Sequence, residues 1–284
     1  MKATATPFRS NFYLWNGLSA IFFSNCVTHV HSHNTLQILI DLQTHFRCRV
    51  GNKDWQPYKN LIIKEDVPHQ LDTAGSVQLI IYLDIDTTVA KNIKDKYLQK
   101  KEAAAPDLDL FGSLKPDEWQ QALLKPNPER LLHIIQQILR TLTGETAQRS
   151  DPRIKIIERT IATSHPDELN TPALAAKIHL SESRLRALFK EHTGVSLYKY
   201  ILWNKIRYAI NRIMNGTPVN EAAWGAGFTD NSHFHKMLVT MFGISPSQFL
   251  KDHKTMQILS CDQSPLFFET KVYDANGEVE KIYK

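Results

Sequence analysis

The chain has 284 residues, 42% of them hydrophobic, and a formal net charge of +5. This length and composition exclude a disordered or fibrous protein and suggest about two domains with buried cores. The first ten residues contain no apolar signal core, and the longest apolar runs fall well short of the ~20 residues that cross a bilayer, so a cytoplasmic protein without membrane contact is expected.

Residues 10–90 are predicted to form short strands. The strand-like runs are FYLW, AIFF, TLQILIDL, HFRCRV, NLIIKE and VQLIIYLDI, separated by turn sequences such as GNKD and TAGS. Strands of this length and spacing predict a barrel or a sandwich. Cys26, Cys48 and Cys261 form no C-x-x-C pair, which argues against a cysteine zinc site or a disulfide framework.

The segment 91–148 is predicted to be helical, in PDEWQQALL and PERLLHIIQQILRTL. In the second run the apolar residues recur at intervals of three and four, which gives one strongly apolar face: Leu131, Ile134, Ile135, Ile138, Leu139 and Leu142. This face either packs on the neighbouring strands or forms a subunit interface.

A new domain is predicted to begin at Asp151, which can cap a helix whose first residue is Pro152. Further helices are expected from the Thr-Pro at 171–172, from a cap at Ser181 to Gly194, and from Ser196 to Met214. Residues 151–255 hold 14 Lys and Arg against 9 Asp and Glu, so the whole formal charge surplus lies here. A basic segment suits contact with phosphate groups, although a surplus of this size also fits an ordinary surface.

This domain contains an internal repeat. LAAKIHLSESRLRALFKEHTGVSLYKYI, residues 174–201, is echoed by EAAWGAGFTDNSHFHKMLVTMFGISPSQFL, residues 221–250. Leu185 matches Phe234 at an offset of 49, whereas Ala175 matches Ala223 at 48, so the second copy has one extra residue between its two helical halves. Each copy is typical of a helix-turn-helix unit, which places its second helix in a DNA groove.

The second copy also carries a specific motif, made of Gly227, Phe228, Asn231, Ser232, Phe234, Lys236, Gly243, Ser245, Pro246 and Phe249. With this motif, residues 154–251 resemble the DNA-binding domain of the AraC/XylS family of bacterial transcription regulators. The resemblance implies two helix-turn-helix units joined by a long helix.

The outward faces of the two recognition helices supply the candidate DNA-binding residues. In the first helix, Leu185, Leu188 and Phe189 are predicted to point inward. The outward candidates are Ser183, Arg184, Arg186 and Lys190. The planar guanidinium of Arg186 matches the two acceptors on the guanine edge, and a phosphate contact is the alternative for this residue. Arg184 and Lys190 are assigned to phosphates.

In the second helix the candidates are Asn231, Ser232, His235 and Lys236. The Asn231 amide suits adenine, and Lys236 reaches guanine or a phosphate. Where the family often has a basic residue near position 238, this chain has Val239 and Thr240, which predicts a weaker backbone grip. Because Arg186 corresponds to His235 and Glu182 to Asn231, the two units are expected to read different sequences.

The N-terminal half, through HVHSHNTLQILIDL and DVPHQL, resembles the cupin-like sensor domain of many AraC-type regulators. His29, His31 and His33 alternate, so on a strand all three would share one face. The resemblance makes His31, His33, Gln37 and His69 candidates for an effector site, and the three histidines candidates for a divalent metal ion. Gln37 is a poor metal ligand, so three alternatives to metal binding remain open. The histidines would instead form hydrogen bonds at the barrel mouth, line a pocket for an organic ligand, or face solvent.

Two further sets of N-terminal residues are kept as alternatives. Phe46, Trp55 and Tyr82 either support the effector pocket or belong to the core. Cys26 and Cys48 could form a redox switch only if they are adjacent in space. The alternative is that both are buried, unreactive cysteines.

The expected fold is α+β: a cupin-like barrel with a helical connector over 1–150, a helical DNA-binding domain over 151–255, and a hairpin over 256–284 with its turn at Asn276 and Gly277. The predicted function is sequence-specific transcription regulation rather than catalysis. Expected partners are double-stranded DNA, a small-molecule effector, a second copy of the chain, and RNA polymerase if the protein activates transcription. The alternatives are a metal-dependent cupin enzyme or metal sensor attached to a DNA-binding domain, and an architectural DNA binder.

Overall fold

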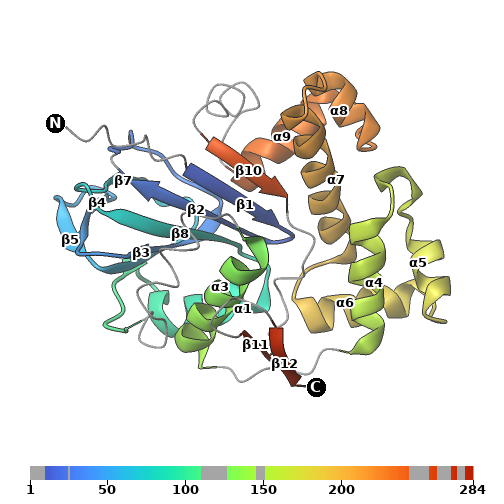
Figure 1. Cartoon of the computed structure of the whole chain (residues 1–284), viewed down its shortest axis with the longest axis horizontal. Helices are drawn as coiled ribbons and strands as arrows, with labels where there is room; N and C mark the ends of the chain where they lie inside the picture. The colour runs from blue at the N-terminus through green and yellow to red at the C-terminus, as the bar shows by residue number, and fades with distance from the viewer. Residues whose placement is uncertain are drawn as a thin grey trace.

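The computed structural model describes residues 10–24, 26–109, 127–144, 151–242, 256–260, 270–273 and 279–283. These residues form a β-rich half and a helical half that lie side by side (Figure 1). The α+β fold class is confirmed. The predicted helix PDEWQQALL lies outside the described residues.

The β-rich half is built from two sheets. The larger has the order β10-β1-β2-β8-β3-β6-β9 and the smaller the order β5-β4-β7. Their bounds are β1 (Ser10–Trp15), β2 (Leu18–Ser24), β3 (Thr35–Asp41), β4 (Phe46–Val50), β5 (Gln56–Tyr58), β6 (Asn60–Ile63), β7 (His69–Asp72), β8 (Val77–Asp84), β9 (Ala103–Ala104) and β10 (Met256–Ser260). All six predicted strands are present. The sequence pattern missed β5 and β7, which have only three and four residues and no continuous apolar run.

The larger sheet is covered on both faces, which explains why every residue of β3 is buried. On one face, Leu36, Ile38 and Ile40 belong to a core shared with the helices α1 (Thr88–Ile93) and α3 (Pro128–Thr143). On the other face, Leu39 shares a core with Phe46 of the smaller sheet. A strand that is buried on both sides has no need of the apolar–polar alternation of a half-exposed strand.

The six apolar residues predicted for one face of α3 are at most 3% exposed, and they belong to the core that α3 shares with the larger sheet. Of the two alternatives for this helix, packing on the neighbouring strands is therefore correct. The alternative that these six residues form a subunit interface is wrong. The N-cap is Asn127, whose side chain accepts a hydrogen bond from the backbone N–H of Arg130, and Gly144 ends the helix with φ 76°.

The helical half contains α4 (Pro152–Thr163), the 3-10 turn η2 (Pro166–Glu168), α5 (Thr171–Lys177), α6 (Glu182–Thr193), α7 (Leu197–Met214), α8 (Val219–Gly225) and α9 (Asn231–Phe242). The predicted caps are confirmed. Asp151 and Ser181 accept hydrogen bonds from backbone N–H groups at the starts of α4 and α6, and Gly194 ends α6 in the left-handed conformation. A polar side-chain oxygen at the N-cap satisfies an N–H that has no partner inside the helix.

The two halves meet along β8, α1 and α7. The Nζ of Lys199 on α7 lies 2.7 Å from an Asp84 carboxylate oxygen and 2.6 Å from one of Asp86. Trp203 of α7 packs directly on Gly17, in the turn between β1 and β2, where there is no room for a side chain. The helical half is thus held to the β-rich half by both charge and packing.

The end of the chain returns to the first domain. β10 pairs with β1 in parallel, with Ser10 opposite Met256 and Leu14 opposite Ser260 (Figure 1). β11 (Thr270–Tyr273) and β12 (Val279–Tyr283) pair antiparallel as a separate two-stranded sheet, as the predicted hairpin requires. None of the helices that the structure describes has the length and apolar character needed to cross a membrane.

Candidate functional sites

The sequence repeat is a structural repeat. The turn between α5 and α6 contains His179 with φ 55°, and the turn between α8 and α9 contains Gly227 with φ 75°, at the offset of 48. Ser181 caps α6, while the side chain of Asp230 accepts a hydrogen bond from the backbone N–H of His233 at 2.7 Å, at the offset of 49. The extra residue of the second copy therefore lies in the turn, between the left-handed residue and the cap of the second helix.

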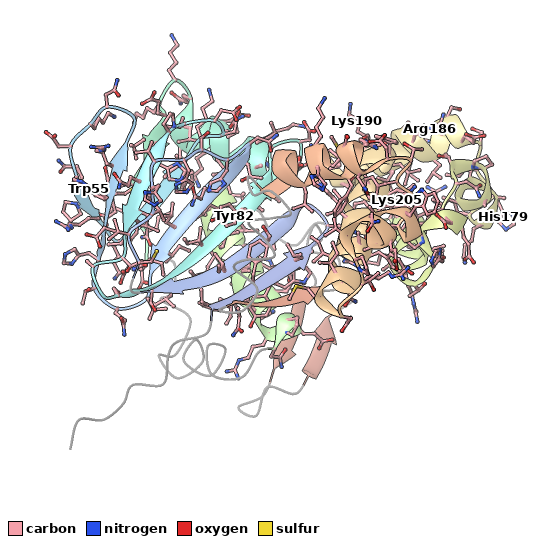
Figure 2. All side chains as sticks on the ribbon, turned by 90° about the horizontal axis from the view of Figure 1, so that it is seen from above. Trp55, Tyr82, His179, Arg186, Lys190 and Lys205 are labelled. Atoms are coloured by element: carbon pink, nitrogen blue, oxygen red, sulfur yellow. The ribbon has the colours of Figure 1, made fainter. Side chains whose placement is uncertain are left out.

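The first recognition helix, α6, separates its residues as predicted. Leu185, Leu188 and Phe189 are at most 3% exposed. The four candidates are all exposed: Ser183, Arg184, Arg186 and Lys190. Figure 2 shows Arg186 and Lys190 on one side of the helical half, with Trp55 at the opposite end of the molecule. The sequence did not indicate that Arg186 is held by an ion pair to Glu182 at 2.7 Å, one helical turn away.

The second recognition helix, α9, has the same division. Phe234 and Leu238 are fully buried. The four candidates are again exposed: Asn231, Ser232, His235 and Lys236. The family residues Gly243, Ser245, Pro246 and Phe249 lie outside the described residues.

A groove of about 500 Å³ lies between the two units and is lined by residues of both. Arg186 and Lys190 reach it from α6, Lys205 from α7 and His233 from α9. Tyr198, which is 70% exposed, stands at the same groove near the start of α7. The sequence pattern missed Tyr198 and Lys205. Both lie on the long helix outside its buried face. Helical periodicity identifies such residues only as surface residues and does not distinguish the ones that line a groove.

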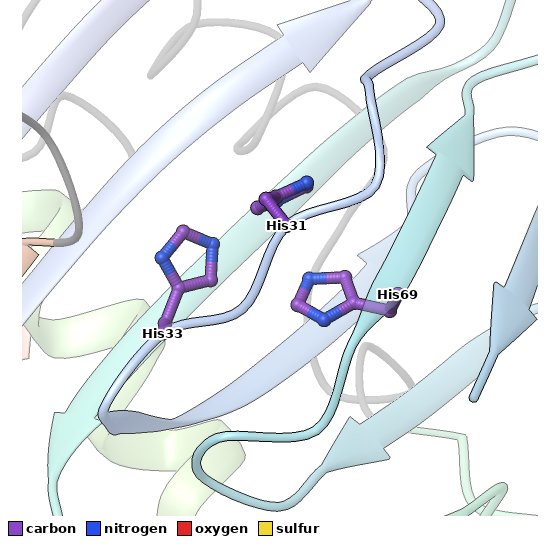
Figure 3. A group of neighbouring side chains, drawn as sticks. All are labelled: His31, His33 and His69. Atoms are coloured by element: carbon purple, nitrogen blue, oxygen red, sulfur yellow. The ribbon is translucent and has the colours of Figure 1, made fainter.

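The second site is a cluster of His31, His33 and His69 (Figure 3). One ring nitrogen of each lies within 4.8 Å of those of the other two. The cluster is held by backbone hydrogen bonds in both directions between His31 and His69, at 3.0 and 2.9 Å. The prediction for His29 is wrong: this segment makes isolated bridges rather than a continuous strand, so alternation does not apply, and His29 is exposed outside the cluster.

Two imidazoles of the cluster, those of His33 and His69, are held in the neutral form. Burial, together with the neighbouring His31 and His69, lowers the pKa of His33 to about 3. Burial also lowers the pKa of His69 to about 4, against the opposing effect of its hydrogen bond to the Val67 carbonyl. Burial disfavours the charged form of a base, so neither ring carries a proton charge near pH 7.

Gln37 and Tyr82 extend the cluster. They are directly opposite each other on β3 and β8, so their side chains share one face of the sheet. The ring centroid of Tyr82 lies 5.0 Å from that of His33, and the buried Oε1 of Gln37 has no hydrogen-bond partner among the described residues. Of the other two aromatic candidates, Phe46 belongs to the core, and Trp55 lies under the Arg47 guanidinium at the far end of the domain.

Cys48 is fully buried, and burial raises the pKa of its thiol to about 12, so it is not a reactive thiolate. Cys26 and Cys48 are both free thiols.

Comparison with known proteins identifies the helical half. The family described as a helix-turn-helix domain matches residues 174–252. The "uncharacterized HTH-type transcriptional regulator YidL" of Escherichia coli is 34% identical over 108 residues, 37% of this chain and 36% of that protein. The "HTH-type transcriptional activator RhaS" of Escherichia coli is 28% identical over 105 residues, 36% of this chain and 37% of that protein. The alignments thus span about a third of the length of these relatives.

Among solved structures, ToxT from Vibrio cholerae aligns over 86% of this chain and 97% of its own, with 13% identity and a TM-score of 0.42. The residues matched by the family model, 174–252, contain the helices α6 and α9 and the turns before them. Residues 174–252 thus match the helix-turn-helix domain family, and the relatives that share about a third of their length with this chain are named as transcriptional regulators.

Proposed function

We propose that this protein is a sequence-specific DNA-binding transcription regulator whose two helix-turn-helix units read neighbouring segments of one DNA duplex. The observation that carries the proposal is the pair of capped recognition helices, α6 and α9, whose apolar faces are buried and whose polar and basic candidate residues are exposed. The helix-turn-helix family matches residues 174–252, and relatives named as transcriptional regulators align with about a third of the chain.

The spacing of the two units supports binding to adjacent groove faces. α7, which joins them, has 18 residues. At ~1.5 Å per residue it is about 27 Å long. α6 precedes α7 directly, and α9 follows it through α8. One turn of DNA measures ~34 Å, and the two recognition helices are proposed to enter successive openings of the major groove.

The exposed residues divide into two roles. Arg186 is assigned to a guanine edge and Asn231 to an adenine edge, because their planar groups match those pairs of donors and acceptors. Ser183, Ser232, His235 and Lys236 are assigned to bases or phosphates around them. Arg184 and Lys190 are assigned to phosphates, which fix the position of the protein without reading sequence.

The β-rich half is proposed to act as the sensor. It contacts α7 directly through Asp84, Asp86 and Gly17, so a change in its shape reaches the helix that spaces the two units. An effector bound among His31, His33, Gln37 and His69 would alter DNA binding only if it prefers one arrangement of the two halves. A second copy of the chain and RNA polymerase are proposed as further partners, in the cytoplasm.

The test is selection of bound sequences from a random duplex pool with the full chain, followed by affinity measurements on the selected site. Arg186→Ala is expected to weaken binding to the selected site by ~1 to 3 kcal/mol and to relax the preference at a single base pair. Arg159→Ala is the matched control, since Arg159 is exposed on α4, outside both units.

Three outcomes are informative. Equal weakening on all sequences would make Arg186 a phosphate contact. Asn231→Ala makes the corresponding test for α9, and no effect would show that the second unit hardly reads bases. Failure to enrich any sequence would contradict the proposed function.

A further inference from the structure

We propose that His31, His33 and His69 form a binding site for a divalent late transition metal ion such as Zn²⁺, and that this ion is the effector of the sensor half. The first part concerns the cluster alone. The second part rests on the proposed function, because it requires that the protein bind DNA.

The first support is the second layer of hydrogen bonds around the cluster. The Nδ1 of His31 lies 2.7 Å from the His29 carbonyl oxygen, and the Nδ1 of His69 lies 2.9 Å from that of Val67. A carbonyl oxygen only accepts, so both rings donate from Nδ1, which leaves Nε2 of each ring as the atom available to a metal ion. Ligating histidines are commonly oriented in this way, with the second nitrogen donating to a backbone carbonyl.

The second support is a set of buried nitrogens without partners. Both ring nitrogens of His33 and the Nε2 of His69 are buried. None of these three atoms has a hydrogen-bond partner among the described residues. Leaving a polar atom buried and unsatisfied costs ~1 to 3 kcal/mol, so such atoms call for a specific explanation. A bound cation satisfies the lone pairs that face the centre of the cluster.

The third support is the distance between the candidate ligand atoms. They lie within 4.8 Å of one another. Three nitrogens at ~2.1 Å from a tetrahedral ion are ~3.4 Å apart, so the rings need to close by little more than 1 Å. His31 and His33 are half-buried and His69 is buried, and the backbone between His31 and His69 is already fixed by two hydrogen bonds, so the closure is assigned to the side chains.

The chemistry of the donors selects the metal. The cluster contains three imidazoles and no carboxylate within the part of the chain that the structure describes. Mg²⁺, Ca²⁺ and Mn²⁺ favour carboxylate and other oxygen ligands, whereas imidazole suits Zn²⁺, Cu²⁺ and Ni²⁺. Three protein ligands leave a fourth position for water, and the unpartnered Oε1 of Gln37 on the same side of the sheet as Tyr82 is suited to accept a hydrogen bond from that water.

The cluster is connected to the helical half through one side chain. The Tyr82 ring contacts that of His33, and Tyr82 also lines a small cavity of about 30 Å³ with Trp203 and Arg207 of α7. Closing the rings around an ion moves His33 relative to Tyr82, and so changes the packing against α7. Metal binding is therefore expected to alter the spacing of the two recognition helices.

The binding test uses calorimetric titration of ZnCl₂ into the untagged full chain, freed of metal with EDTA and without DNA. We expect one equivalent of Zn²⁺ per chain, and at least tenfold weaker binding in both His33→Gln and His69→Gln. His29→Gln is the matched control, because its side chain is exposed and outside the cluster, and it is expected to bind as the unmodified chain does. Mg²⁺ at the same concentration is expected to give no binding.

A thermal unfolding curve of each variant separates loss of the site from loss of the fold. Zn²⁺ is expected to raise the midpoint of the unmodified chain and of His29→Gln, and to leave that of His33→Gln unchanged. Absence of Zn²⁺ binding to the folded chain, or binding that survives both cluster variants, would overturn the metal site.

The effector test compares affinity for the selected DNA with Zn²⁺ and with EDTA. A change of at least tenfold is expected, equal to about 1.4 kcal/mol, and Tyr82→Ala is expected to bind Zn²⁺ but to lose most of the change. Zn²⁺ binding with no effect on DNA affinity would overturn the effector role and leave the metal site. DNA binding that never occurs in either condition would instead contradict the proposed function, while the calorimetry stands by itself.

Discussion

A β-carbon built on Gly194, at the end of recognition helix α6, would lie 2.5 Å from the backbone nitrogen of Thr88, at the start of α1. This glycine has φ 76°. It therefore combines two constraints that usually occur separately: a left-handed backbone at a helix end, and close approach of two domains. The end of the first recognition helix is in direct contact with the sensor half.

Gly194→Ala is expected to destabilise the protein more than Gly216→Ala. Both residues have positive φ, but a β-carbon at Gly216 meets nothing within 4 Å. The left-handed conformation alone costs ~1 to 2 kcal/mol, so Gly216→Ala measures that effect and the excess at Gly194 measures the contact with Thr88. Urea unfolding gives both free energies, and equal losses would show that the two halves separate freely at this point.

Lys199→Met is expected to destabilise the contact between the halves. Asp84 is mostly buried, and burial raises the pKa of its carboxyl despite the opposing hydrogen bond from Lys199. Removing the cation leaves this carboxylate without its partner, at a cost of ~1 to 3 kcal/mol in unfolding free energy at pH 7. Since the folded-state pKa is raised, protonation of Asp84 relieves the cost, and the deficit should shrink as the pH falls. Lys177→Met, at an exposed position on α5, is the control and should have no such pH dependence.

Stability between pH 4 and pH 2 is expected to depend on Asp151. Hydrogen bonds from the Arg153 guanidinium lower the pKa of Asp151 from 3.8 to about 2. The folded state thus binds this proton less readily than the unfolded chain, so the stabilisation is present above about pH 4 and is lost as the pH falls toward 2. Asp151→Asn should remove that part of the acid sensitivity while keeping a capping side chain, and Asp151→Ala should also cost ~1 kcal/mol at pH 7. Unfolding curves at several pH values check this. Asp54→Asn, at an exposed position, is the control, and its unfolding free energy is expected to vary with pH as that of the unmodified chain does.

Glu182→Gln is expected to strengthen DNA binding. Glu182 holds the Arg186 guanidinium at 2.7 Å, and both side chains are exposed, so the pair contributes little to folding. Replacing the carboxylate frees Arg186 and removes a negative charge from the proposed interface, which should tighten binding three- to tenfold at low salt. Glu191→Gln on the same helix controls for the general effect of charge, since no ion pair joins Glu191 to a described residue. An equal gain in both variants would show that release of Arg186 is unimportant.

The helical half was predictable because its signals are local. Caps at Asp151 and Ser181, the stop at Gly194 and the buried stripe of α6 each depend on residues within one or two turns. The exposed candidates followed from the same periodicity. The ion pair between Glu182 and Arg186 was not predicted: a spacing of four residues permits it, but its formation depends on rotamers that a pattern does not specify.

The β-rich half was predictable only in part, because its arrangement depends on distant pairings. Apolar runs marked the longer strands, yet nothing in the sequence near His31 indicates that its backbone pairs with His69. The error at His29 has the same origin: alternation has meaning only in a continuous strand, and the bridges around His31 interrupt it. Lys199 and Asp84, 115 positions apart, meet through the packing of the two halves.

The parallel pairing of β10 with β1 also determines how the gene for this protein can be divided. The recognition helices are encoded between two segments that build adjacent strands of one sheet, so a fragment ending before Met256 would leave the backbone groups of β1 open along one edge. An open strand edge is a template for self-association. Shortened versions of the chain are therefore expected to precipitate even when every DNA-contacting residue is retained, and a minimal functional version has to include both ends of the sheet.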